Sequence, residues 1–126
     1  MKISTFNPLV ISPKADEIVK LFEEMGFNKN HAPVIPLENG DVEDIRLKDE
    51  NRNYIDVANS QQVPQDVTAI RINVENFAEA YDILRKHGFK NTRGDRVVVS
   101  ETSMSATMVS KSGLTIILMR HVKEKE

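Results

Sequence analysis

The sequence predicts an α+β fold in which one domain contains two β-α-β-β-β modules. Two observations support this prediction. The helix stop Gly-Phe occurs twice, at Gly26-Phe27 and at Gly88-Phe89, with a spacing of 62 residues (88 − 26 = 62). A strand pattern precedes each of these helices and three strand patterns follow it, which indicates an internal duplication.

The first module begins with the strand pattern NPLVIS, residues 7–12, and continues into a helix pattern that ends at Met25. We expect Ser12 to cap this helix and Pro13 to take its first position, where the missing N–H of proline costs nothing. The apolar side chains recur at the i, i+3, i+4, i+7 spacing of one helix face: Ile18, Leu21, Phe22 and Met25. Gly26 then adopts the left-handed conformation, and Phe27 folds back onto the last turn.

Three short strands complete the first module, at APVIPL (32–37), VEDIRLK (42–48) and NYIDVAN (53–59). Pro33 and Pro36 lack the N–H that a ladder needs, so the first of these strands is expected at an edge. A linker, SQQVPQD (60–66), separates the modules, which we therefore place at residues 1–60 and 61–126.

The second module repeats the order with the strand AIRINV (69–74) and a helix that starts after Asn76. Asn76 followed by Glu79 resembles a capping box. The apolar face of this helix comprises Phe77, Ala80, Tyr81 and Leu84. Three strand patterns follow again, at RVVVSE (96–101), SATMVS (105–110) and LTIILMR (114–120).

The composition excludes several classes of function. With a formal net charge of −2 and no basic cluster, the chain is not expected to bind nucleic acid. It has no cysteine, so disulfides, thiolate metal sites and cysteine nucleophiles are ruled out. The N-terminus lacks the apolar run of a signal peptide, and no stretch has the length of a membrane span. We expect a cytoplasmic protein with no membrane partner.

The strand-helix-Gly-Phe cadence over nearly the whole chain resembles the vicinal oxygen chelate superfamily, which includes glyoxalase I, bleomycin-resistance proteins and extradiol dioxygenases. The resemblance implies that the two modules form a curved mixed sheet, or cup. In the enzymes of this superfamily a divalent metal sits in the cup on four protein ligands. The matching positions here hold Asn7, Asp56, Ala69 and Ile117. Alanine and isoleucine have no lone pair to offer, so no metal and no cofactor are expected.

Strand alternation predicts which polar side chains lie opposite the helices and so line this cup. They are Asn7, Arg46, Tyr54, Asp56, Arg71 and Asn73, beside Leu9, Ile117 and Met119. Two arginines on one face are suited to bind a carboxylate or phosphate in bidentate fashion. Tyr54 offers a ring face and a hydroxyl. The three histidines add little, and His121 is expected in a frayed, solvated tail.

The leading hypothesis is a metal-independent protein that binds a small organic, possibly anionic, molecule in the cup, as bleomycin-resistance proteins do. One alternative is a glyoxalase-like lyase or related metalloenzyme with displaced ligands such as His31, Asp56 and Glu101. Another is a structural or interaction protein whose cup is occluded. The sequence assigns no catalytic residue and leaves open whether the chain is an enzyme. All three hypotheses expect a homodimer.

Overall fold

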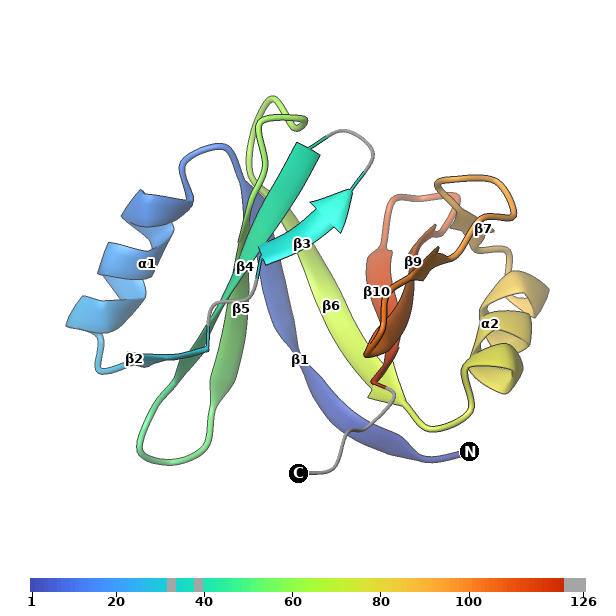
Figure 1. The fold of residues 1–126 in the computed structure, drawn as a ribbon, viewed down its shortest axis with the longest axis horizontal. Helices are drawn as coiled ribbons and strands as arrows, with labels where there is room; N and C mark the ends of the chain where they lie inside the picture. Colours follow the sequence, from blue (N-terminus) through green and yellow to red (C-terminus); the bar gives the residue numbers. More distant parts are fainter. Residues whose placement is uncertain (32–33, 38–39, 122–126) are drawn as a thin grey trace. The chain divides into compact units, whose positions relative to one another are not determined.

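The computed structural model describes residues 1–31, 34–37 and 40–121, and the side chains of residues 1–30 and 43–121. The chain divides into two compact units, Asn7–Thr68 and Met1–Phe6 with Ala69–Glu126. Each unit has the order strand, helix and antiparallel strands (Figure 1). Because each combines parallel and antiparallel pairs, the predicted α+β fold with a mixed sheet and two β-α-β-β-β modules is confirmed. No helix within the described residues is long and apolar enough to cross a membrane.

The unit Asn7–Thr68 contains α1 and the strands that pair beneath it. Its elements are β1 (Ile3–Ser12, which starts in the other unit), α1 (Ala15–Glu24), β2 (Asn28–His31), β3 (Val34–Leu37), β4 (Gly40–Lys48) and β5 (Tyr54–Asn59). The strand order is β2-β4-β5-β1, with β3 also paired to β4. The β1–β5 pair is parallel, whereas β4 is antiparallel to each of its partners.

The core of this unit lies between α1 and the sheet. The buried side chains are Ala15, Val19, Ile45, Leu47, Ile55 and Val57, with Val10, Ile18, Phe22 and Phe27 packed against them. The predicted alternation on β4 and β5 is therefore confirmed. The predicted face of α1 is partly wrong, because Leu21 and Met25 are 51% and 67% exposed. The face that packs is Ala15, Ile18, Val19 and Phe22, which has the same helical spacing, and its two smaller side chains, Ala15 and Val19, are the buried ones.

The start of α1 also differs from the prediction. The helix begins at Ala15, its N-cap is Lys14, and no side chain caps it. Instead, the Ser12 hydroxyl accepts a hydrogen bond from Lys14 N (2.9 Å) and donates one to Asp66 Oδ1 (2.6 Å). Ser12 therefore stabilises the turn between β1 and the helix rather than the helix itself, a local alternative that serine hydroxyls often take.

Both Gly-Phe stops are confirmed. Gly26 and Gly88 have φ of +113° and +90°. Beyond them, Phe27 N donates to Phe22 O and Phe89 N donates to Leu84 O, both at 3.0 Å. This is the 6→1 hydrogen bond of a Schellman motif, which satisfies a carbonyl at the helix end. The rings of Phe27 and Phe22 meet edge to face at 5.6 Å, so Phe27 does fold back onto the last turn.

The second unit has an equivalent plan. Its elements after β1 are β6 (Val67–Val74), α2 (Phe77–Lys86), β7 (Lys90–Asn91), β8 (Val98–Val99), β9 (Ser103–Val109) and β10 (Thr115–His121). The strand order is β6-β10-β9-β7, and β8 pairs with β9. The buried core comprises Val74, Phe77, Ala80, Ala106, Met108 and Leu118. Asn76 caps α2 as predicted, because its Oδ1 accepts from Glu79 N at 3.0 Å.

Candidate functional site

A buried carboxylate lies at the centre of the polar face of the unit Asn7–Thr68. Asp56 on β5 is 0% exposed. Arg46 lies directly opposite on β4 and donates from Nε to Oδ1 (3.1 Å) and from Nη2 to Oδ2 (3.4 Å). From β1, Asn7 Nδ2 donates to the same Oδ1 (3.1 Å) and to the Pro8 carbonyl (2.9 Å). Both carboxylate oxygens therefore already have donors from the chain.

Two cationic side chains flank Tyr54 on the same face. The centroid of the Tyr54 ring lies 6.0 Å from Arg46 Cζ and 5.7 Å from Lys48 Nζ. Lys48 is directly opposite Tyr54, just as Arg46 is opposite Asp56. The strand pattern produces this face: Ile45, Leu47, Ile55 and Val57 pack under α1, so the residues that alternate with them emerge on the other side of the sheet.

The structure thus gathers four of the six ligand residues predicted from the sequence, namely Asn7, Arg46, Tyr54 and Asp56. The other two, Arg71 and Asn73, lie on β6 in the second unit. Arg71 is 2% exposed. It donates from Nε to Met119 Sδ (3.2 Å), and its Nη2 lies 3.2 Å from His121 Nε2.

The prediction for His121 is wrong in part, because the residue is exposed as expected but belongs to a strand. It ends β10, opposite Ser103 on β9, rather than lying in a frayed tail. Its N–H donates to Asn73 Oδ1 at 3.3 Å. The sequence could have predicted this position, because side chains two residues apart on a strand share a sheet face and His121 follows Met119 by two residues.

The strand register supports the equivalence of Asp56 in the first module and Ile117 in the second, two of the positions where the superfamily has metal ligands. Leu9 is paired with Asp56 in the first module, and Arg71 is paired with Ile117 in the second. Arg71 follows Leu9 by the same 62 residues that separate the glycines (71 − 9 = 62). Asp56 and Ile117 therefore occupy equivalent positions on their strands.

The residues at the positions implied by the superfamily do not fit a metal. Asp56 is bound by a guanidinium and by the Asn7 amide, and a divalent ion would have to displace that guanidinium. Ala69 and Ile117 have no donor atom. Among the residues whose side chains are described, no group of three or more His, Asp or Glu gathers anywhere. Of the displaced ligand set, the His31 side chain lies outside the described residues, and Glu101 is exposed beyond β8.

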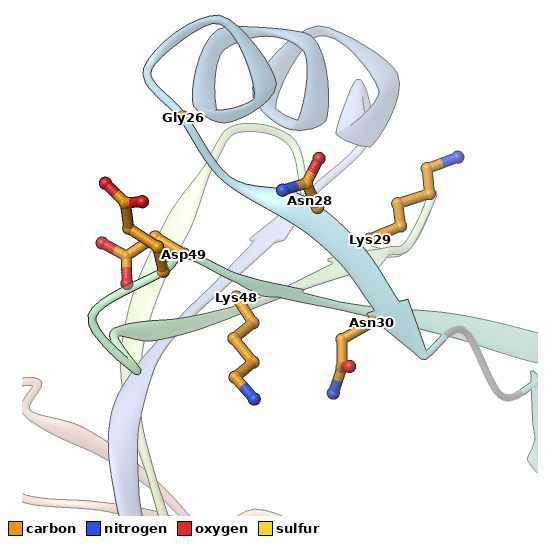
Figure 2. Close-up of a pocket in the computed structure, with 7 residues that line it drawn as sticks. Gly26, Asn28, Lys29, Asn30, Lys48 and Asp49 are labelled. Atoms are coloured by element: carbon orange, nitrogen blue, oxygen red, sulfur yellow. The ribbon is translucent and has the colours of Figure 1, made fainter.

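An open concavity of about 410 Å³ adjoins this polar face at the end of β4. It is lined by Gly26, Asn28, Lys29, Asn30, Lys48, Asp49 and Glu50 (Figure 2). Lys48 and Asn30 extend from neighbouring strands to the side away from α1 (Figure 2). Lys48 is thus shared between the concavity and the surroundings of Tyr54.

The turn beside this concavity is held by Asp49. Its Oδ2 accepts from Asn53 Nδ2 (2.8 Å), and its Oδ1 accepts from the backbone N–H groups of Asn53 (2.8 Å) and Asn51 (2.9 Å). These bonds, first among them the one from the Asn53 side chain, lower the pKa of Asp49 below its ordinary value of 3.8. Asp49, like Ser12, therefore stabilises a turn, because its carboxylate accepts hydrogen bonds from residues of that turn.

Known structures share this fold at low sequence identity. A hypothetical protein from Bacillus halodurans C-125 superposes with a TM-score of 0.72 at 12% identity over 100% of this chain and 99% of its own. A glyoxalase I variant from Zea mays gives 0.67 at 11% identity over 98% of this chain, which spans 45% of that longer protein. A glyoxalase/bleomycin resistance protein/dioxygenase superfamily member from Vibrio splendidus 12B01 gives 0.56 at 10% identity over 94% of this chain and 99% of its own.

These likenesses establish the class of fold. The chain has the glyoxalase/bleomycin-resistance/dioxygenase fold of the vicinal oxygen chelate superfamily over its full length, as the sequence predicted. No family model matches the chain, and no curated protein matches it in sequence.

Proposed function

We propose that this chain is a metal-independent binding protein for a small organic anion, which it takes on the polar face formed by Arg46, Tyr54 and Asp56. The observation that supports this most directly is that both carboxylate oxygens of Asp56 accept hydrogen bonds from neighbouring side chains. In a metal site this carboxylate would be the first ligand, yet its two oxygens are bound to Arg46 and Asn7. The role left for the face is recognition of a ligand by its charge.

The cationic groups of this face favour an anion. Arg46 and Lys48 flank an aromatic ring, and the negative charges on the same face are those of the buried Asp56, which pairs with Arg46, and of Asp44 on β4. Charge-assisted hydrogen bonds to arginine are about twice as strong as neutral ones, so an anion gains most here. That Arg71 and Asn73 contact the same ligand remains a prediction. Arg71 contacts Met119 and His121, and a variant at Arg71 is included in the binding test below.

The proposal is tested with the untagged protein in buffer containing EDTA. Small organic acids and neutral molecules of matched size are compared by thermal shift, and hits are measured by calorimetry. We expect saturable binding of acids that survives EDTA and weakens at least tenfold in Arg46→Gln. The exposed Lys111→Gln variant removes one charge elsewhere and should leave the affinity unchanged. Binding that needs an added divalent metal, or that is indifferent to Arg46, would overturn the proposal.

A further inference from the structure

We propose that the ligand is a monocarboxylate, bound end-on by the Nη1 and Nη2 groups of Arg46, and that Asp56 and Asn7 act as positioning residues for that guanidinium. This inference rests on the proposed function and names the chemical group that the face recognises. It follows from how the donors of Arg46 are divided between Asp56 and the remaining edge of the guanidinium.

A guanidinium has five N–H donors in one plane. Asp56 takes the edge formed by Nε and Nη2 (3.1 and 3.4 Å). Three N–H groups remain, and for these Arg46 has no protein acceptor among the residues whose side chains are described. Two of the three, one on Nη1 and one on Nη2, point in parallel from the end of the group. That pair matches the two oxygens of a carboxylate.

The orientation of the Arg46 guanidinium is fixed by its hydrogen bonds to Asp56. Asp56 is fully buried, and Asn7 holds it while donating to the Pro8 carbonyl. The Arg46 side chain is 23% exposed. The accessible part of the ion pair is therefore the guanidinium and not the carboxylate. Such a preorganised donor loses little entropy on binding.

The neighbours of Arg46 narrow the class of ligand further. The Tyr54 hydroxyl also has no protein partner within the described part of the chain, and the Lys48 ammonium lies on the same ring. A flat acid can place its carboxylate on Arg46 and its apolar body near Tyr54. Asp44 and Asp56 contribute two carboxylates to the same face, and they oppose a second negative charge on the ligand, so a monoanion is favoured over a dianion.

The probes are benzoate, its neutral isostere benzamide, and phenylphosphonate at pH 8. Each is titrated into ¹⁵N-labelled protein while the arginine side-chain resonances are observed. We expect benzoate to shift the Arg46 Nη signals saturably and to bind at least tenfold more tightly than either other probe. Arg46→Lys keeps the charge next to Asp56 but removes the fork, so benzoate affinity should fall at least tenfold. Lys29→Gln, which removes a charge from β2, should change it less than twofold.

The positioning role has its own signature. In the unchanged protein, restrained rotation should give separate Nη proton signals for Arg46. In Asp56→Asn these signals should merge and benzoate affinity should fall, whereas Asp56→Glu should recover part of both. Merged signals in the unchanged protein would overturn the positioning role.

The outcomes separate the two proposals. Equal affinities for benzoate and benzamide, or full affinity in Arg46→Lys, would overturn the carboxylate fork while binding at this face still stands. Tighter binding of phenylphosphonate would replace the monocarboxylate by a tetrahedral dianion and overturn the inference. If no organic acid or neutral molecule bound to this face, the proposed function would fail together with the inference.

Discussion

Arg46 and Asp56 lie directly opposite each other on neighbouring antiparallel strands, and Arg46 Nε donates to Asp56 Oδ1 across 3.1 Å. The carboxylate is fully buried and the guanidinium is not. The positive charge beside Asp56 is thus supplied by a side chain, that of Arg46, and a metal ion bound to Asp56 would have to replace it. The pair should therefore affect both the stability of the fold and the binding of a ligand.

Removing either partner should destabilise the fold, and by different amounts. Asp56→Asn loses charge-assisted hydrogen bonds and should lower the free energy of unfolding by about 2 kcal/mol. Arg46→Met takes the guanidinium away from a buried carboxylate and should cost about 3 kcal/mol. Urea unfolding of both variants measures these changes. The double variant Arg46→Met/Asp56→Asn should cost less than the two single changes together, and strict additivity would show that the pair is not coupled.

Much of this site was predictable from the sequence, because the two-residue period of a strand determines which side chains share a face. The apolar residues of β4 and β5 identify the side under α1, so Arg46, Tyr54 and Asp56 follow. The hydrogen bond from Asn7 also follows from β1 lying beside β5, but its geometry depends on the register, in which Leu9 and not Asn7 is opposite Asp56.

Three predictions failed because they depended on tertiary contacts, which the periodicity of a sequence does not reveal. In α1, two overlapping stripes have the same spacing, and tertiary packing selects the one with Ala15 and Val19 over the one with Leu21 and Met25. Ser12 has two local uses for its hydroxyl, and the partner that decides between them, Asp66, is 54 residues away. His121 is ordered by Asn73 and Arg71 from β6, contacts that no local pattern reveals.

The glycine stops should be costly to replace. At φ = +90°, Gly88 occupies a conformation that L-residues avoid, while an added Cβ would meet no atom within 4 Å. The cost of Gly88→Ala is therefore conformational, about 1–2 kcal/mol in the free energy of unfolding. Gly88→Asn, which tolerates this region better, should cost less. Thermal unfolding compares the two variants, and equal stability of Gly88→Ala and the unchanged protein would contradict the assigned backbone.

Asp49 should make stability depend on pH through Asn53. Since its pKa is lower in the folded chain than its ordinary value, the hydrogen bonds stabilise the fold above that ordinary value, and the stabilisation is lost as the pH falls through the folded pKa. Asn53→Ala removes the largest cause, so the pKa of Asp49, followed by carboxyl NMR, should rise. Asn51→Ala is the matched control, because Asn51 donates only from its backbone and its substitution should leave that pKa in place. A pKa that responds equally to both substitutions would contradict the role given to the Asn53 side chain.

His121 should accept a hydrogen bond on Nε2 and so have its ring proton on Nδ1. Arginine only donates, so the 3.2 Å contact between Arg71 Nη2 and His121 Nε2 requires Nε2 to accept. Long-range ¹H–¹⁵N correlation spectra distinguish the two tautomers directly. His87 at the C-cap of α2 is exposed, so it supplies the internal comparison and should show the mixture of tautomers of a solvated imidazole. Finding His121 protonated on Nε2 would contradict the contact between Arg71 Nη2 and His121 Nε2.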